Sequence, residues 1–267
     1  MTILVTGSSG FIGRHFIQRV QTRHDVMSMD IRDAPTITHD LTNPIINELH
    51  QHIDVIVHFA ANSCIRLCNN NPLETYINNV TMLLHVLEYA RLNDSRVIFI
   101  SSSNADNPTS NVYGLSKHAC EDIILFYRSF YRTKVSIVRP FNVYGPGSTK
   151  SVINIFQQQY LERSPLTITG DGENRRDFTH VSDIVMGLER LLEIHTDEVI
   201  SLGTGTNYSI NEVAEFFNRD RIYLNAVPGE LRETKADIRH AKRLLNWQPS
   251  IDLRSYIAQF KQSLKVM

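Results

Sequence analysis

The sequence has little cysteine, no excess of charge of either sign and no long apolar run. Three cysteines, an odd number, argue against a disulfide framework, and Cys64 and Cys68 have no second pair to complete a zinc site. The 27 basic and 28 acidic side chains give a net charge of −1, which excludes charge-driven binding to nucleic acid or to an anionic membrane. The longest apolar stretches, such as 97–100, fall far short of the ~18 residues of a membrane span.

The N-terminus has no basic segment, apolar core and small-residue cleavage site of the kind that a secretory signal requires. We therefore expect a soluble, cytoplasmic protein. The 11 histidines form no ligand pattern either, so no bound metal is expected.

Apolar runs of four to seven residues alternate with longer stretches of helical period over the first two-thirds of the chain. This alternation is typical of repeated strand-helix-strand units, so the predicted class is α/β, a Rossmann-type doubly wound parallel sheet. The pattern predicts strands near 2–6, 25–29, 54–59, 96–101, 134–139 and 198–202 and helices near 11–22, 72–91, 114–131 and 181–193. Asn71, Pro72 and Glu74 predict a capped start for the second helix.

Turn signals become frequent after Pro140, at Gly145-Pro146-Gly147 and at Gly170-Asp171-Gly172. We expect one domain over 1–145 together with 180–203, which returns to the sheet. A smaller second lobe is expected over 146–179 and 204–267.

A glycine-rich turn lies between the first strand and the first helix, with Gly7, Gly10 and Gly13 around Phe11 and Ile12. With 12 glycines in the chain, this spacing is expected by chance only roughly 0.02 times. In this position the glycines provide a tight turn, close approach of the backbone to a pyrophosphate, and close packing of helix on strand. The pyrophosphate then meets free N–H groups at the helix N-terminus, so a bound dinucleotide is predicted.

Asp30 closes the second strand, ahead of Ile31 and Arg32. A carboxylate there accepts hydrogen bonds from the adenosine ribose hydroxyls and repels a 2′-phosphate, which favours NAD over NADP. The guanidinium of Arg32 can neutralise such a phosphate, so NADP stays open as the alternative.

Tyr113 and Lys117 are four residues apart at the start of a predicted helix, on one face with Cβ atoms ~5–6 Å apart. For the phenol to act as a base, its pKa must fall from about 10 to near neutral, which requires about 4 kcal/mol. One positive charge at ~5 Å supplies roughly 3 kcal/mol at an effective dielectric constant of 20. The charges of the lysine and of an oxidised nicotinamide together are therefore large enough to lower the phenol pKa to near neutral, and either charge alone is too small.

Ser101, Ser102 and Ser103 follow the strand at 97–100, at the carboxyl edge where open parallel sheets bind ligands. A hydroxyl there can hold a substrate oxygen in line with Tyr113. The alternative is an ordinary turn at the strand exit.

These residues resemble the extended short-chain dehydrogenase/reductase family, in particular its NAD-dependent nucleotide-sugar epimerases and dehydratases, similar to UDP-glucose 4-epimerase. The resemblance covers nearly the whole chain. Its segments are 6–13, Asp40-Leu41, 58–61, 78–80, 139–145, 170–181, 228–230 and 244–249.

The resemblance implies a role for each matching residue. It implies a catalytic triad of Ser103, Tyr113 and Lys117. It also implies that NAD is held by the glycine turn, Asp30, Ile31 and Arg32, and further by Asp40, Leu41, Phe59, Ala60, Ala61, Asn78, Ser101, Ser102, Tyr113, Lys117 and Phe141. The implied substrate-binding residues are Ser63, Ser103, Asn142, Arg176 and Arg232. In this assignment the first domain binds NAD and the second lobe binds the sugar nucleotide.

The implied reaction is epimerisation of a nucleotide-diphosphate sugar, most plausibly at C4. Tyr113 as phenolate takes the proton from a sugar hydroxyl while hydride passes to NAD, and the keto-sugar then turns over and receives the hydride on its other face. Alternatives are a nucleotide-ketosugar reductase of the same family, which consumes NAD(P)H, and a dinucleotide-binding protein without chemistry.

Three departures from the family fall on the substrate side. Ser103 is followed by Asn104-Ala105 in place of the Asp-Glu pair of 4,6-dehydratases, so elimination of water lacks its general acid. The loop between Ser103 and Tyr113 is short, and Val227 stands where the family carries an arginine.

The resemblance also implies a homodimer through helices 72–91 and 114–131. The second of these helices contains the apolar run 123–127, which is wider than the single stripe that a surface helix buries. Burial of this helix within the monomer is the alternative.

Overall fold

The computed structural model describes residues 1–32, 36–45, 49 and 51–266. The chain forms two compact units, the first over 1–139 and 185–200 and the second over 140–184 and 201–267. Each unit has its own hydrophobic core. The assignment of NAD to one unit and of substrate to the other remains a prediction.

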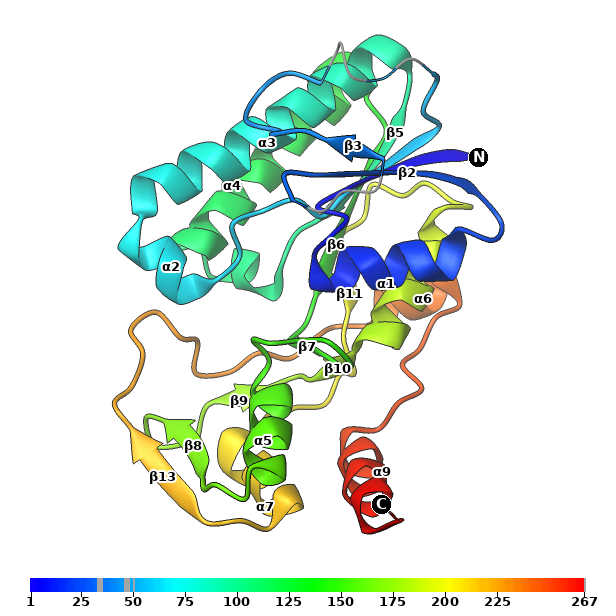
Figure 1. Ribbon diagram of the computed structural model, residues 1–267. Helices are drawn as coiled ribbons and strands as arrows, with labels where there is room; N and C mark the ends of the chain where they lie inside the picture. The colour runs from blue at the N-terminus through cyan, green and yellow to red at the C-terminus, as the bar shows by residue number, and fades with distance from the viewer. Residues whose placement is uncertain (33–35, 46–48, 50, 267) are drawn as a thin grey trace. The chain divides into compact units, whose positions relative to one another are not determined.

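A seven-stranded sheet organises the first unit, with the strand order β11-β6-β5-β4-β1-β2-β3 (Figure 1). The pairs of β1 with β2 and β4, of β2 with β3, of β4 with β5 and of β5 with β6 are parallel. The strands are β1 (Thr2–Thr6), β2 (Asp25–Asp30), β3 (Ile37–Thr38), β4 (Val55–His58), β5 (Arg96–Ile100), β6 (Val135–Pro140) and β11 (Ile200–Leu202). The predicted doubly wound parallel sheet is confirmed.

Apart from α2, which was not predicted, the helices of this region begin and end close to the predicted bounds. They are α1 (Phe11–Val20), α2 (Ile65–Asn70), α3 (Pro72–Asn93), α4 (Val112–Phe126) and α6 (Val181–Leu191), with the 3-10 turn η1 (Ser103–Asp106) and the π-helical turn η2 (Tyr127–Tyr131). The helix predicted over 114–131 is thus α4 followed by η2, and Arg132 ends it with a φ of 61°.

Two asparagines show how sequence signals for a helix start can succeed or fail. Asn111 caps α4, because its side-chain oxygen accepts a hydrogen bond from the Gly114 N–H at 2.8 Å. Asn71 stands at the predicted start of α3, but its side chain makes no cap and donates instead to the Leu67 carbonyl at 3.3 Å. The expected Asn71 side-chain cap is therefore wrong, because α2 ends at the same residue and its last turn takes the amide.

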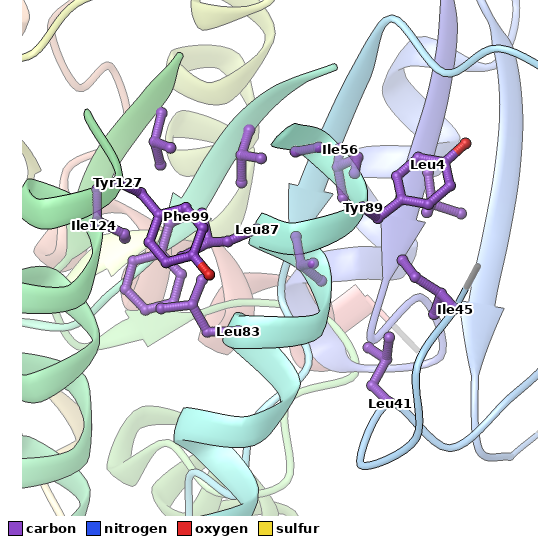
Figure 2. Close-up of a cluster of buried hydrophobic side chains, with 14 of the residues drawn as sticks. Leu4, Leu41, Ile45, Ile56, Leu83, Leu87, Tyr89, Phe99, Ile124 and Tyr127 are labelled. Atoms are coloured by element: carbon purple, nitrogen blue, oxygen red, sulfur yellow. The ribbon is translucent and has the colours of Figure 1, made fainter. Parts of the chain in front are cut away.

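One face of the sheet is covered by α3 and α4, as Figure 2 shows for the buried side chains between them. Leu4, Ile56 and Phe99 of three neighbouring strands pack with Leu83 and Leu87 of α3, and all five are fully buried. Burial of each such side chain contributes about 1.5–3 kcal/mol. The alternate strand residues face the opposite side, where α1 lies.

The second unit is built from short strands and helices. Its elements are β7 (Val143–Tyr144), α5 (Val152–Leu161), β8 (Leu166–Thr169), β9 (Arg175–Arg176), β10 (Thr179–His180), β12 (Tyr208–Ser209), α7 (Ile210–Phe217), β13 (Arg221–Leu224), α8 (Arg239–Leu245) and α9 (Leu253–Val266). Buried Asp177 holds loops together by accepting bonds from the N–H groups of Thr204, Gly205 and Ala236. These hydrogen bonds connect the loops of a unit whose short strands form few strand-to-strand hydrogen bonds.

The chain runs from β1 outward through β2 and β3 and then returns to β4 on the other side of β1. In an open parallel sheet, ligands bind at the carboxyl ends of the strands that flank this change of direction. A dinucleotide is therefore expected to bind at the segments after β1 and β4. Within the described residues, no helix has the length and apolar character needed to cross a bilayer.

Candidate active site

The glycine turn after β1 lies directly against the segment after β4. A Cβ on Gly7 would stand 2.5 Å from the Ala60 nitrogen, and Gly7 has a φ of 67°. A Cβ on Gly13 would lie 2.5 Å from the Gly7 carbonyl oxygen. A side chain is thus excluded at Gly7 by space and by backbone conformation, and at Gly13 by space.

The first turn of α1 has no side-chain cap, since Gly10 occupies the N-cap position and no acid follows it. Phe11 and Ile12 begin this helix and stand half-buried. Backbone donors at the N-terminus of a helix, beside a glycine-rich turn, suit a pyrophosphate. The residues after β1 therefore fit NAD.

Asp30 ends β2 and contacts the glycine turn. One carboxylate oxygen accepts a hydrogen bond from the Ser9 N–H at 3.0 Å and the other accepts from the Arg32 N–H at 3.2 Å. Both bonds come from backbone groups and orient the carboxylate, which leaves further lone pairs for ribose hydroxyls. The side chains of Ile31 and Arg32 are exposed beside it.

Asp40 and Leu41 occupy different environments. Asp40 is exposed, and hydrogen bonds from the Thr42 N–H and hydroxyl hold the pKa of its carboxyl below the usual value. The Leu41 side chain is buried in the core of the first unit, and its carbonyl pairs with the His85 ring at 2.8 Å. A contact of this pair with adenine remains a prediction, and for Leu41 it would use the backbone.

The exit of β4 is anchored by a buried histidine. A hydrogen bond of 2.7 Å joins His58 Nδ1 to Thr6 Oγ1, and burial with the nearby charge of Lys117 lowers the pKa of His58 to about 3. His58 is therefore neutral, and it fixes the start of the half-buried segment Phe59-Ala60-Ala61. Ser63, the predicted substrate residue of this segment, is exposed.

Asn79 is a positioning residue that the motif reading missed, because only its neighbour Asn78, which is half-buried, was assigned to the cofactor. The Asn79 side chain accepts from the Asn62 N–H at 2.8 Å and donates to the Ser116 hydroxyl at 2.9 Å. It thus ties the segment after β4 to the turn of α4 between Tyr113 and Lys117. The available signal was an amide on an otherwise apolar helix face.

Tyr113 lies in the first turn of α4, next to the end of β5. Burial raises the pKa of its phenol to about 12, and a hydrogen bond with the Ser102 side chain partly opposes this effect. The sequence argument anticipated a pKa lowered by lysine. In the structure, burial is the largest effect on the pKa of the phenol, so the phenol is neutral in the protein by itself.

The Lys117 ammonium is held at the end of β5. Its Nζ donates to the Ile100 carbonyl at 2.8 Å, lies 4.6 Å from the centre of the Phe99 ring and 6.0 Å from that of Tyr113. Burial lowers the pKa of Lys117 to about 8, so it is mostly protonated at neutral pH. At 6 Å and an effective dielectric constant of 20, its charge offers about 3 kcal/mol to a phenolate.

The three serines have separate surroundings. Ser101 is buried and its hydroxyl donates to Glu121, while the Ser102 oxygen accepts from the Asn104 N–H at 3.2 Å and bonds to Tyr113. Ser103 is buried at the start of η1. The structure thus brings Ser102, Tyr113 and Lys117 together at the end of β5, and the catalytic role of Ser103 stays a prediction.

Phe141 and Asn142 belong to the second unit. Phe141 is buried, and its N–H donates a hydrogen bond to the Leu202 carbonyl at 3.0 Å. The Asn142 amide donates to the Asp177 carbonyl at 3.1 Å and to the Thr234 hydroxyl at 2.9 Å. Its φ of 24° falls in a region that asparagine tolerates better than most residues. Asn142 therefore has a structural task besides the substrate contact predicted for it.

The two arginines predicted to bind substrate differ in how they are engaged. Arg232 is exposed and pairs with Asp171 at 2.9 Å. The Arg176 side chain is 13% exposed, and its nearest carboxylate oxygen, on Glu230, is 4.0 Å away. Burial lowers the pKa of Arg176, with Glu230 opposing this. Arg176 is half-buried, donates to the Arg175 carbonyl at 3.0 Å and, among the described residues, has only this distant counter-charge, so it is the better candidate for a diphosphate.

All three cysteines are free thiols, and no group of three or more potential ligand side chains suited to a metal ion occurs among the described residues. Cys68 Sγ donates to the Asn62 carbonyl at 3.4 Å and Cys120 Sγ to the Asn79 carbonyl at 3.6 Å. Both therefore serve packing around α2, α3 and α4.

A Rossmann-type sheet, a glycine-rich turn before α1 and a Tyr-Lys pair at the end of β5 define an NAD-binding oxidoreductase-like protein. The sequence model described as "NAD dependent epimerase/dehydratase family" matches residues 3–203. The chain belongs to this family.

Relatives extend the match over the whole chain. A Methanocaldococcus jannaschii protein, provisionally named a UDP-glucose 4-epimerase, is 30% identical over 98% of this chain and 98% of its own length. UDP-glucuronate 4-epimerase of Thermodesulfobacterium geofontis is 33% identical over 75% of this chain and 69% of its own. The Bacillus cereus UDP-glucuronic acid 4-epimerase, solved with UDP-glucuronic acid and NAD, has a TM-score of 0.90 and 27% identity over 100% of both chains. The predicted family, fold, cofactor NAD and NAD-dependent epimerase class are confirmed.

Proposed function

We propose that the protein is a 4-epimerase of UDP-linked sugars, with a UDP-hexuronic acid or UDP-hexose as substrate. The observation that carries the proposal is the contact of the Tyr113 phenol with Ser102, with Lys117 held 6.0 Å from the tyrosine ring. The relatives named for 4-epimerase activity and the neighbouring structure with UDP-glucuronic acid support this choice of substrate class.

In this proposal Tyr113 removes the proton from the C4 hydroxyl of the sugar and later returns it. Bound NAD supplies the hydride acceptor and a positive charge. Lys117 stabilises the phenolate, and its roughly 3 kcal/mol offsets only part of what a phenol with a pKa of about 12 needs. Tyr113 is therefore expected to gain its basic form only when NAD is bound.

The groups around Ser103 do not support elimination of water. The next side chain, Asn104, donates to the Ser102 oxygen at 3.2 Å and accepts from the Asn111 amide at 3.1 Å. An amide in that network cannot act as the general acid of a dehydratase. Epimerisation needs no such acid.

The test is incubation of the purified protein with UDP-glucuronic acid, UDP-glucose and UDP-N-acetylglucosamine, with products resolved by NMR. Formation of the C4 epimer without net change in NADH absorbance is the expected result. Net formation of NADH or NADPH from added oxidised cofactor would identify a ketosugar reductase running in reverse, and loss of CO2 from UDP-glucuronic acid would identify a decarboxylase. Absence of any turnover with bound NAD would leave a binding protein.

Tyr113→Phe is the decisive variant, with Tyr223→Phe as the control at an exposed phenol of the second unit. Tyr113→Phe is expected to lower turnover by about 10²–10⁴-fold and to leave NAD binding intact. Unchanged epimerisation by Tyr113→Phe contradicts the assignment of the base.

We further propose a homodimer through α3 and α4. Apolar side chains stay exposed along one stripe of each helix, among them Leu73 and Ile77 of α3 and Leu115 and Phe126 of α4, continued by Phe130 of η2. Phe130 is 68% exposed, and such apolar stripes are usually covered by a partner. Light scattering at micromolar concentration should give a dimer mass, and Leu73→Glu combined with Phe130→Glu should give a monomer. Ile222→Glu, on β13, is the control that should stay dimeric.

A cytoplasmic location is also proposed. The three free thiols fit a reducing compartment. Fractionation of cells that express the tagged chain tests this, and recovery with exported proteins would contradict it.

A further inference from the structure

Glu121 is a buried carboxylate one helical turn beyond Lys117 on α4, and the reaction as proposed gives it no task. The residue is 6% exposed. Its carboxylate accepts hydrogen bonds from the Ser101 hydroxyl and from Arg139 Nε at 2.9 Å, and a second Arg139 nitrogen, Nη2, completes a two-bond pair. A buried charge is retained only where such partners compensate its desolvation.

Arg139 connects Glu121 to η1, the turn that begins at Ser103. Its third nitrogen, Nη1, pairs with Asp106, the last residue of η1. The 3-10 turn η1 begins at Ser103. One guanidinium at the end of β6 therefore joins α4 to the turn that follows β5.

Ser101 connects Glu121 to the carbonyl that binds Lys117. The Ile100 carbonyl accepts a hydrogen bond from the Lys117 ammonium at 2.8 Å, and it belongs to the peptide bond between Ile100 and Ser101. That peptide's N–H donates to the Val138 carbonyl at 2.7 Å, and the Ser101 hydroxyl donates to Glu121. The carbonyl that orients the lysine is thus fixed on one side by β6 and on the other by Glu121.

We propose that Glu121 is a positioning residue for the epimerisation, acting through Ser101 and Arg139 to hold the Ile100 carbonyl, and with it Lys117, in place beside Tyr113. This inference rests on the proposed function. Glu121 also supplies the negative charge that lets two buried cations, Lys117 and Arg139, stand near one another.

Two acidic side chains, Glu121 and Asp106, face the Arg139 guanidinium at the end of β6. The titratable and charged groups around the ammonium are Tyr113, Cys120 and Glu121 on its own helix, His58 at the end of β4, Arg139 at the end of β6 and Asp106 of η1. Burial lowers the pKa of Lys117 to about 8, and Cys120 and then Glu121 oppose that fall. Loss of Glu121 should therefore deprotonate Lys117 at a lower pH.

The first experiment compares Glu121→Gln with Asp122→Asn, which removes the same charge from the next, exposed residue of α4. For Glu121→Gln we expect kcat to fall by about tenfold or more with KM within about twofold, and the alkaline limb of the kcat profile to move down by about one pH unit. Asp122→Asn should match the wild type. An unmoved alkaline limb in folded Glu121→Gln overturns the proposal.

Arg139→Lys distinguishes the hydrogen-bond geometry of Arg139 from its positive charge. It also tests the proposal if Glu121→Gln fails to fold. A lysine retains the positive charge but cannot make the two-bond pair and reach Asp106 together. We expect a lower kcat with an unmoved alkaline limb. Wild-type kcat in Arg139→Lys contradicts the positioning role.

A readout independent of activity distinguishes failure of this inference from failure of the proposed function. The ammonium of Lys117 can be titrated by NMR on protein with isotope-labelled lysine, with Lys117→Met giving the assignment. A lower titration midpoint in Glu121→Gln than in Asp122→Asn supports the inference even if no UDP sugar is turned over. Equal midpoints refute it even if the wild type is an active epimerase.

Discussion

Gly7 and Ala60 stand in backbone contact, so close that a Cβ on Gly7 would lie 2.5 Å from the Ala60 nitrogen and 2.8 Å from its Cα. The two residues follow β1 and β4, the neighbouring strands between which the sheet changes direction. Their contact brings two backbone segments together without side chains between them. This is the condition for a pyrophosphate to approach main-chain N–H groups.

Gly7→Ala should abolish NAD binding, because the new methyl group meets backbone atoms that cannot move aside. Gly170→Ala is the matched control, since Gly170 has nearly the same φ, 68°, but its Cβ would meet nothing closer than 3.5 Å. Both variants should lose about 1–2 kcal/mol of stability through the left-handed backbone. Calorimetry with NAD should separate them, and normal NAD affinity in Gly7→Ala would show that the turn is not the cofactor site.

Ser102→Ala and Ser103→Ala should have different pH profiles. The Ser102 hydrogen bond lowers the pKa of Tyr113, so its loss raises that pKa and moves the acid limb of kcat/KM to higher pH by about 0.5–1 pH unit. Ser103→Ala should lower kcat without moving this limb, if Ser103 holds the substrate oxygen. A shifted limb in Ser103→Ala instead would exchange the two roles.

Arg176→Gln should raise KM for the UDP sugar by about 10–100-fold, as expected when a charge-assisted hydrogen bond to a diphosphate is lost. Arg232→Gln should change KM by less than about threefold, because this exposed side chain is already paired with Asp171. NAD affinity, measured in parallel, should stay at the wild-type value in both. Equal effects on KM would mean that burial does not select the diphosphate ligand.

Acid should destabilise the protein through His58. Its pKa is lowered from 6.5 to about 3, so the unfolded chain binds a proton that the folded chain does not, and stability falls as pH drops below 6.5. Between pH 6.5 and 5 the loss is about 2 kcal/mol. Urea denaturation at the two pH values should show this loss in the wild type and not in His58→Asn. Thr6→Ala, which removes only the hydrogen-bond partner, should be less stable at both values but keep the difference.

The sheet and the cofactor turn could be predicted from the sequence because their causes are local. Strands buried on both faces are short continuous apolar runs, and the glycines after β1 are required by a backbone conformation and a close approach within one turn. The six predicted strands and four predicted helices therefore correspond to elements of the structure. The cap at Asn71 failed because another helix ends at the same residue, which a single motif does not reveal.

The side-chain environment of the site depended on residues far apart in the chain. The spacing of Tyr113 and Lys117 identified the pair, but the direction of the phenol pKa follows from burial, which no spacing reports. The same holds for Asn79, whose amide joins segments 37 residues apart in the chain.

The sequence by itself determined that this is an NAD-binding α/β protein of the epimerase/dehydratase family, because the glycine turn, the strand-end carboxylate and the Tyr-Lys spacing are short-range patterns. Only the tertiary structure decided which serine contacts the phenol, which arginine is left with a distant counter-charge, and how Glu121 and Arg139 support Lys117. Those relationships arise from desolvation and from pairing across strands and helices, and both exist only once the chain is folded.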